Sequence, residues 1–292
     1  MEIRELSAAP GLGPLYARAV LGSIVPGGGD ELPDRRLELR GLEVDRAHLA
    51  AYDRVCGFRL SDELPVTYPH VLAFPLAMQL MTDRSFPFSL LGLVHVANRI
   101  DQRRPLRADE RPTLRVWAEN LRPHPRGRQF DLVAEAEIEG EVVWSDRSAY
   151  LRQGEGGSQG ASKGERDEDP EPEEPIATWS VPGDIGRRYA DVSGDRNPIH
   201  LHSLSARLFG VRGPIAHGMW MKARCLAGLE GRLPASYRAE VRFTSPLKVP
   251  SEVGFAARRD AGDWRFVLRR QGSDRPHLTG SIQPLGPGPD AD

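Results

Sequence analysis

A carboxylate and an imidazole stand five residues apart in the second half of this 292-residue chain. Asp195 and His200 flank the sequence Arg-Asn197-Pro198-Ile, and an Asn-Pro pair favours a bend of the backbone. Such a bend can bring both side chains to one water molecule. A carboxylate and an imidazole placed together are suited to general acid–base chemistry, so this pair is the first candidate for a catalytic site.

A glycine eighteen residues beyond His200 adds a third candidate. Gly218 lies in the sequence Ala216-His217-Gly218-Met219, at the predicted start of an apolar helix. The first N–H groups of a helix have no acceptor within the helix, and the helix dipole favours negative charge there. The amide of Gly218 can therefore donate to a developing oxyanion. Without a Cβ, Gly218 also allows a substrate to approach closely.

Ordinary structural roles are open for several of these residues. Asp-Arg-Asn-Pro is a common turn sequence, in which the Asp side chain usually bonds its own backbone. His217 can orient the turn before the helix, and His202 fits a solvated neighbour. Ser193 and Tyr189 fit packing or supporting positions, although Ser193 could hydrogen-bond a catalytic group. Since Ser193 lies in Val-Ser-Gly-Asp and not in G-x-S-x-G, a nucleophilic Ser-His-Asp triad is not expected.

The combined pattern resembles the MaoC-like, or hydratase-2, family of hot-dog enzymes. The family pattern is a Tyr or Phe, then Ser-Gly-Asp-x-Asn-Pro-Ile-His, and later Ala-His-Gly-Met. Every part occurs here in order, from Tyr189 to Met219. The resemblance implies a hydro-lyase that interconverts trans-2-enoyl and (R)-3-hydroxyacyl thioesters in fatty-acid metabolism. It also implies the fold, an antiparallel sheet wrapped around a central helix.

The chemistry of that reaction accounts for the residue types. Adding water to an enoyl thioester needs a base for the water and an acid for Cα, and dehydration reverses both steps. Enolate-like charge on the thioester oxygen needs a fixed donor. The resemblance makes Asp195 and His200 the catalytic pair, without fixing which is acid and which is base, and makes the Gly218 amide the oxyanion hole. We expect three further residues to bind the substrate: Ser193, Asn197 and Met219.

The same resemblance guides the expected cofactors and partners. No metal or redox cofactor is expected, because coenzyme A or the phosphopantetheine of an acyl carrier protein enters as part of the substrate. Arginines near the pocket mouth should bind its phosphates, and the candidates by sequence proximity are Arg196, Arg207 and Arg212. Acyl chain length and the physiological direction stay open. Two other functions are considered: a hot-dog acyl thioesterase, and a non-catalytic acyl-thioester-binding subunit. The Ser-Gly-Asp-x-Asn-Pro-Ile-His run argues against the first, and the intact motif argues against the second.

Composition divides the chain. Residues 153–175 are rich in Gly and Ser, then in acidic residues and Pro, with no large apolar side chain to bury. This composition favours a flexible linker over an ordered surface loop. It separates a predicted N-terminal domain, residues 1–152, from a predicted catalytic domain, residues 176–292.

The two parts are weakly similar to each other. Residues 44–57 align with residues 181–194 without a gap, and two later segments match in the same order, from 69 opposite 214 and from 93 opposite 238. Each copy has an apolar helical segment followed by alternating strands, a pattern typical of an α+β fold. The sequence thus predicts a double hot-dog, an intrachain pseudodimer that could pair further as a homodimer.

The first copy lacks the reacting residues. Phe58 stands opposite Asp195, no Asn-Pro-x-His follows it, and Ala73 stands opposite Gly218. The N-terminal copy should therefore be catalytically silent and widen the acyl pocket. Residues 68–75 and 86–91 could line that pocket or form plain core.

Overall composition excludes several classes. The net charge of −2 and the absence of a basic cluster argue against nucleic acid or an anionic membrane as a partner. No apolar run approaches the roughly 20 residues of a membrane span, and the N-terminus has no signal-like apolar stretch, so a cytoplasmic location is expected. Cys56 and Cys225 should be free thiols, and no zinc-binding spacing occurs.

Overall fold

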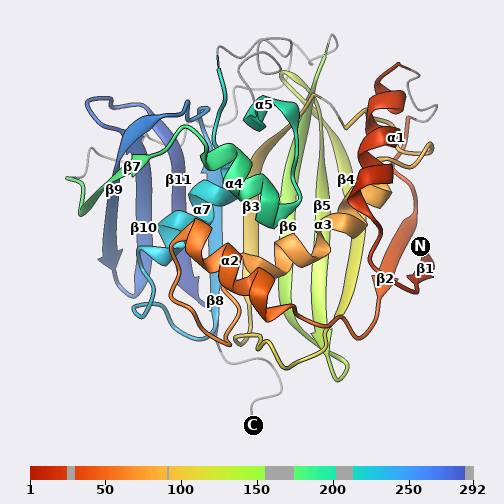
Figure 1. Cartoon of the computed structure of the whole chain (residues 1–292), viewed down its shortest axis with the longest axis horizontal. Helices are drawn as coiled ribbons and strands as arrows, with labels where there is room; N and C mark the ends of the chain where they lie inside the picture. The colour runs from red at the N-terminus through yellow and green to blue at the C-terminus, as the bar shows by residue number, and fades with distance from the viewer. Residues whose placement is uncertain (25–29, 91, 155–173, 202–212, 287–292) are drawn as a thin grey trace.

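The computed structural model describes residues 1–24, 30–90, 92–154, 174–201 and 213–286. Its strands form one sheet of eleven, and the helices pack against one face of it (Figure 1). The strands are β1 (Glu2–Leu6), β2 (Arg35–Leu39), β3 (Leu93–Gln102), β4 (Thr113–His124), β5 (Gly127–Ile138), β6 (Glu141–Gln153), β7 (Ala177–Val181), β8 (Tyr237–Phe243), β9 (Ser251–Asp260), β10 (Asp263–Arg270) and β11 (Pro276–Pro284). The helices are α1 (Leu12–Ile24), α2 (Arg46–Cys56), α3 (Tyr68–Met81), α4 (Ile185–Ser193), α5 (Pro198–Leu201) and α7 (Gly218–Ala227).

The order of the strands repeats with twofold symmetry. It runs β1-β2-β4-β5-β6-β3 and then β8-β11-β10-β9-β7, so each strand from β2 to β6 has a counterpart in the second half. β3 and β8 join the halves by antiparallel pairing from Ala97 opposite Arg242 to Gln102 opposite Tyr237. β1 has no counterpart and pairs in parallel with β2. The predicted α+β double hot-dog is confirmed.

Helices α2 and α4 occupy equivalent places and pack together at the centre of the helical layer (Figure 1). Each ends at a glycine in the left-handed conformation, Gly57 with φ 83° and Gly194 with φ 75°. This conformation favours glycine because it has no Cβ. Tyr52 and Tyr189, one from each helix, face each other with ring centroids 6.3 Å apart. The ungapped alignment of residues 44–57 with 181–194 is therefore structurally correct.

The apolar helices α3 and α7 lie over the middle of each half-sheet, where their side chains join one hydrophobic core. Both were predicted from runs of good helix formers with few β-branched residues. Alternate side chains of the strands complete the core, because successive residues of a strand point to opposite faces. Both cysteines are buried, free thiols, as predicted.

One charged group lies within that core. Lys222 of α7 is fully buried, and its ammonium donates to the carbonyl oxygen of Ala239 at 2.9 Å and to the side chain of Asn98 on β3. The Asn98 amide in turn donates to Asp146 at 2.9 Å, and Asp146 is paired with His70 at 2.8 Å. This chain of polar contacts crosses the junction between the halves. Lys222 belongs to the second half, whereas Asn98, Asp146 and His70 belong to the first.

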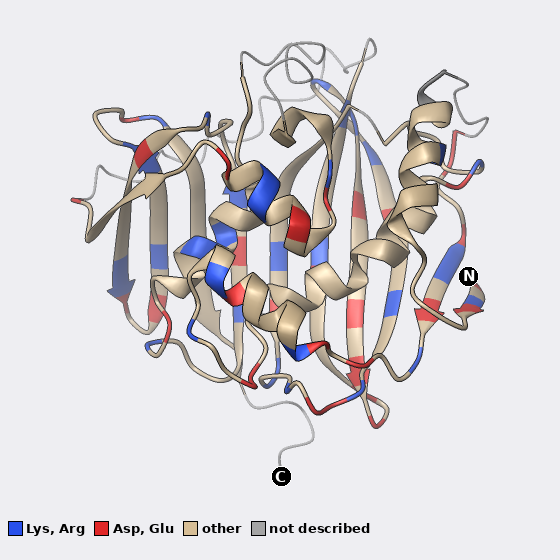
Figure 2. Cartoon of the chain, in the orientation of Figure 1, with Lys and Arg blue, Asp and Glu red and all other residues tan. Residues whose placement is uncertain are grey.

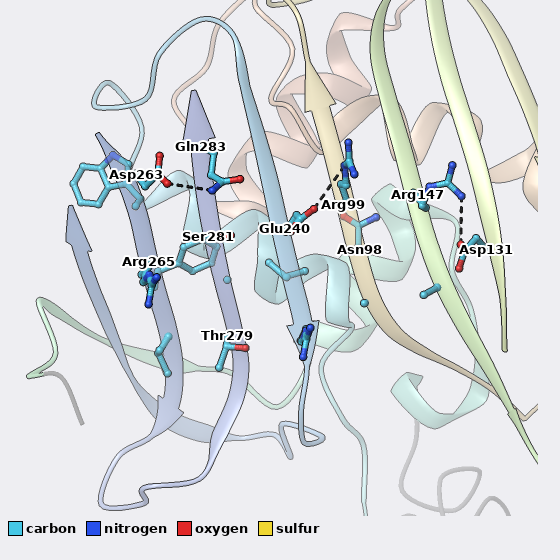
Figure 3. A pocket seen from close by; sticks show the side chains of 18 of the residues that line it. Asn98, Arg99, Asp131, Arg147, Glu240, Asp263, Arg265, Thr279, Ser281 and Gln283 are labelled. Carbon is cyan, nitrogen blue, oxygen red and sulfur yellow. Dashed lines mark hydrogen bonds and ion pairs between the residues drawn. The ribbon is translucent and has the colours of Figure 1, made fainter. Parts of the chain in front are cut away.

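The face of the sheet away from the helices carries a trough of about 960 Å³ (Figure 3). A row of register partners crosses its floor from β10 to β6: Arg265, Ser281, Glu240, Arg99 and Arg147. None of the predicted catalytic residues lines this trough. Basic and acidic residues are interspersed over the helices and strands (Figure 2), as the small net charge suggests.

The predicted domain boundaries stay predictions. β6 ends at Gln153 and β7 begins at Ala177, while most of the predicted linker, residues 155–173, lies outside the described residues. Within the described part of the chain, no helix is long and apolar enough to cross a membrane.

Candidate active site

The loop after α4 builds the site. Gly194 ends the helix, and the hydroxyl of Ser193 accepts a hydrogen bond from the amide of Asp195 at 3.1 Å. The carboxylate of Asp195 accepts from the amide of Asn197 at 3.1 Å, an Asx-turn arrangement. The chain then bends into the short helix α5, which carries His200. The predicted bend at Asn197-Pro198 is thus present and returns His200 toward Asp195.

His200 is held in one tautomer. Its Nδ1 lies 2.8 Å from the carbonyl oxygen of Ile215. A carbonyl only accepts, so Nδ1 carries the proton and Nε2 keeps a lone pair. His200 can therefore accept a proton at Nε2 while the Ile215 carbonyl stabilises the imidazolium.

His217 joins the pair closely. Its Nε2 donates to the backbone carbonyl of Asp195 at 2.9 Å and lies 3.8 Å from the Asp195 carboxylate. Its ring stacks on that of His200, with centroids 3.6 Å apart and an interplanar angle of 25°. His217 is 2% exposed, and its Nδ1 has no hydrogen-bond partner in the described part of the chain. The His217 side chain makes no hydrogen bond to the start of α7, and its ring instead fixes the backbone of Asp195. The expected role of His217 in orienting the turn before that helix stays a prediction.

Burial and charge set the protonation of the three groups. Burial acts to raise the pKa of Asp195, but His217, His200 and the amide of Asn197 outweigh it and hold that pKa below its usual range. Burial lowers the pKa of His200, and it lowers the pKa of His217 to about 3. The site at neutral pH is therefore a carboxylate beside two neutral imidazoles. Asp195 keeps 35% of its side chain exposed, so water can reach it.

Gly218 is the first residue of α7, as predicted, and its amide has no acceptor within the helix. A Cβ at this position would lie 3.0 Å from the ring of Phe243 on β8, tighter than a normal contact. Phe243 meets His95 edge-on at 5.0 Å, and His95 stacks on Tyr150 at 4.6 Å. Strands β3 and β6 of the first half thus contribute His95 and Tyr150 to an aromatic cluster that includes Phe243.

The residues predicted to bind substrate lie close to the pair, but their polar contacts are with the protein. Ser193 and Asn197 bond the backbone of the loop itself. Met219 is 5% exposed and belongs to the hydrophobic core. Their contact with substrate stays a prediction. Arg196 is exposed and pairs with Asp191, whereas His202, Arg207 and Arg212 lie outside the described residues.

The equivalent loop of the first half carries different residues. Phe58 stands at the position of Asp195 and stacks against Tyr52 with ring centroids 6.4 Å apart. Ala73 lies inside α3, which begins five residues earlier, so its amide is used within the helix. These contacts support, without testing, the prediction that the first half is catalytically silent.

Asp195, His200 and His217 also bring one donor atom each to within 4.8 Å of one another, a spacing that a metal ion could use. Each imidazole donates from one nitrogen to a backbone carbonyl, which leaves the other nitrogen of each ring for an ion. The geometry of the two rings decides the question. The lone pair of an imidazole lies in the plane of its ring, and two nearly parallel stacked rings do not converge on one ion. The arrangement fits proton transfer better than metal binding.

Sequence reasoning missed the second role of His217 and the aromatic residues from the first half. The Ala-His-Gly-Met motif signalled that His217 matters, but not that it reaches the Asp195 carbonyl. No local signal marks His95 or Tyr150, which lie more than forty residues before Asp195 in the sequence. Their place follows only from the pairing of β3 with β6 and β8.

The fold and the loop geometry together define a double hot-dog protein with a carboxylate–imidazole site in the loop after α4. Residues 162–266 match the family model described as a MaoC like domain. The chain is 38% identical over 256 residues to 3-hydroxyacyl-thioester dehydratase X of Mycobacterium tuberculosis, covering 88% of this chain and 91% of the relative. The chain therefore belongs to the MaoC-like dehydratase family.

Solved structures agree with this assignment. The crystal structure of HtdX from Mycobacterium tuberculosis superposes with a TM-score of 0.77 at 37% identity, over 86% of this chain and all of the other. A second Mycobacterium tuberculosis protein, whose title describes a double hotdog fold, superposes with a TM-score of 0.52 at 14% identity, over 84% of this chain and 93% of the other. The latter similarity supports the fold alone.

Proposed function

We propose that this protein catalyses the reversible hydration of trans-2-enoyl thioesters to (R)-3-hydroxyacyl thioesters. The observation that carries the proposal is the convergence of Asp195 and His200 with His217, which directly precedes Gly218 at the start of α7. Both proton-transferring groups are unprotonated at neutral pH, as their lowered pKa values indicate. The 38% identity to 3-hydroxyacyl-thioester dehydratase X supports the same substrate class.

In this mechanism the thioester oxygen accepts a hydrogen bond from the Gly218 amide, which stabilises the enolate-like charge. A water molecule gives one proton to the Asp195–His200 pair while its oxygen bonds to Cβ. The pair then delivers one proton to Cα, so that the enzyme returns to its starting state. Dehydration runs the same steps in reverse. No metal or redox group takes part in this proposal, and coenzyme A or an acyl carrier protein belongs to the substrate.

The proposal also covers the setting of the enzyme. The N-terminal half widens the acyl pocket, the protein acts in the cytoplasm, and the residues on either side of 153–175 form separate hot-dog domains. The two halves of one chain form the pseudodimer, and pairing of two whole chains would form a homodimer in addition.

The test uses the purified protein with crotonyl and longer trans-2-enoyl thioesters of coenzyme A. Loss of the enoyl-thioester absorbance without release of free thiol is the expected result. Product oxidised by an (R)-specific, but not an (S)-specific, 3-hydroxyacyl dehydrogenase would support the stereochemistry. Thiol release without hydration would identify a thioesterase. Tight binding with neither reaction would identify a non-catalytic thioester-binding protein.

A further inference from the structure

The first 24 residues lie outside the repeat of the fold. The counterpart of β2 is β7, and among the described residues of the second half none forms a counterpart of β1 or α1. β1 extends the edge of the sheet beside β2, and α1 then returns to the helical side (Figure 1). This N-terminal extension, residues 1–24, therefore needs an explanation other than the hot-dog core.

One face of α1 is turned toward the protein. Leu15 and Ala19 are buried and Leu12 and Tyr16 are half-buried, at the i, i+3, i+4 and i+7 spacing of a single helical face. Leu21, on the other side, is 64% exposed. Through this inward face α1 packs on the protein. Two of its residues, Leu12 and Tyr16, contact the loop of the second half that carries Asp195.

Tyr16 makes two hydrogen bonds that bracket Asp195. Its hydroxyl donates to the carbonyl oxygen of Gly194 at 2.8 Å and accepts from the amide of Arg196 at 2.6 Å. A hydroxyl has one donor and can accept at its lone pairs, so both bonds form at once. The residues before and after Asp195 are therefore tied to one atom of α1.

Packing reinforces this attachment. A Cβ on Gly194 would collide with the side chain of Leu12, one turn before Tyr16, and would touch Phe74 of α3 at 3.4 Å. Glycine at position 194 serves both the left-handed helix end and the close approach of α1. The loop is thus held from three sides: by Leu12 and Tyr16, by Ser193, and by His217.

We propose that Tyr16 is a positioning residue for the reaction: its hydroxyl holds the backbone on both sides of Asp195 so that the carboxylate meets His200 and the reacting water. This inference rests on the proposed function. It assigns the N-terminal half a part in catalysis, although that half supplies no reacting group. Exact placement matters because a displacement of about 1 Å at a catalytic group can cost about 100-fold in rate.

The test compares Tyr16→Phe with wild type in the full-length protein. The variant keeps the ring and loses only the hydroxyl. We expect kcat to fall about tenfold, the equivalent of one lost hydrogen bond, with KM nearly unchanged because acyl contacts remain. We also expect the acid limb of the pH profile to move to higher pH, because a loosened Asp195 loses the amide of Asn197. Tyr52→Phe is the matched control, since it removes another buried tyrosine hydroxyl, bonded to Thr67 at 2.8 Å.

A second measurement is independent of activity. Hydrogen exchange of the peptide containing residues 194–197 should be faster in Tyr16→Phe than in wild type, because the Arg196 amide loses its acceptor, and unchanged in Tyr52→Phe. Unchanged exchange, or faster exchange with wild-type kcat and an unmoved acid limb, would overturn the role of Tyr16. A wild-type protein inert toward every enoyl thioester would instead overturn the proposed function, whatever the exchange shows.

Discussion

Asp195 keeps its charge in a site where two stacked imidazoles replace much of the solvent. His200 and His217 each donate one N–H to a backbone carbonyl, which fixes their orientation, and burial keeps both rings neutral. The amide of Asn197 completes the support of the carboxylate. This local arrangement keeps the base unprotonated and oriented before the substrate arrives.

The lowered pKa values of Asp195 and His200 predict the pH dependence of hydration. Both groups must be unprotonated to accept the proton of water, so kcat/KM should be level near neutral pH and fall as the pH drops through those pKa values. Because both lie below their ordinary values of about 3.9 and about 6.5, the profile should reach half its plateau below about pH 6.5. Initial rates with crotonyl-coenzyme A across the pH range provide the check, and a midpoint above about pH 6.5 would contradict the assignment.

At this scale the sequence predicted where the candidate residues lie, but not what supports them. Asp195, His200 and Gly218 belong to two short motifs, and the structure places them at the predicted loop and helix start, while their roles stay predictions. Tyr16 lies 178 residues from its partner Gly194, so nothing in the local sequence connects them. Contacts of this kind depend on the tertiary fold.

At the scale of elements, the crossing of α4 and α5 sets the place of His200. Gly186 of α4 lies directly against the carbonyl oxygen of His200, and a Cβ there would overlap that oxygen. The helix and the catalytic turn can approach this closely only with glycine at position 186.

Replacement of Gly186 by alanine should therefore reduce activity, although it adds only one methyl group. We expect Gly186→Ala to displace α5 and lower kcat/KM at least about tenfold, in line with the cost of misplacing a catalytic group. Gly183→Ala is the control, because its Cβ would meet Pro250 at an ordinary 3.5 Å. Turnover and thermal unfolding of both variants should be measured together. Equal activity of the two folded variants would show that the crossing tolerates a methyl group.

The sequence predicted several of the elements because periodicity and helix propensity act locally. The strands from β4 to β6 and from β8 to β10, and the apolar helices α3 and α7, appear where alternation and helix formers indicated them. β1 and α1 were not predicted. β1 is short and largely exposed, so its sequence shows no buried face. The apolar face of α1 is too narrow to be recognised from the sequence alone.

At the scale of the whole molecule, the two halves share a buried polar chain as well as a sheet. Lys222 is buried without a direct carboxylate partner, and burial lowers its pKa to about 7. The pKa of a lysine side chain in the unfolded chain is about 10.4. Between those values the unfolded state binds a proton that the folded state lacks, so this group makes stability rise as pH increases from about 7 to about 10.

Lys222→Met should remove that slope. We expect the free energy of unfolding near about pH 10 to fall by roughly 1–3 kcal/mol, because Asn98 and the carbonyl of Ala239 lose a buried donor. Near neutral pH the loss should be smaller, because the variant no longer bears the cost of burying a charge. Between pH 7 and 10 the variant should become less dependent on pH than wild type. Denaturant unfolding at several pH values provides the comparison, and parallel curves for the two proteins would argue against a titrating Lys222.

The linker prediction rests on composition alone. Trypsin should cut first at Lys163 or Arg166, within the predicted linker at 153–175, and leave the halves associated through β3 and β8. Mass spectrometry of the early fragments identifies the sites. Early cuts elsewhere, with this segment intact, would indicate that it is docked on the protein.

The central claim is that one working site lies in the second half, at Asp195, while the equivalent position of the first half, Phe58, carries no chemistry. Its most direct test is the turnover of a four-carbon trans-2-enoyl thioester by Asp195→Asn and Phe58→Leu, each confirmed to be folded. We predict a loss of about 10²–10⁴-fold for Asp195→Asn, since an amide cannot take the proton of water, and nearly wild-type turnover for Phe58→Leu. Near-normal turnover by Asp195→Asn, or abolished turnover by Phe58→Leu, would contradict the claim.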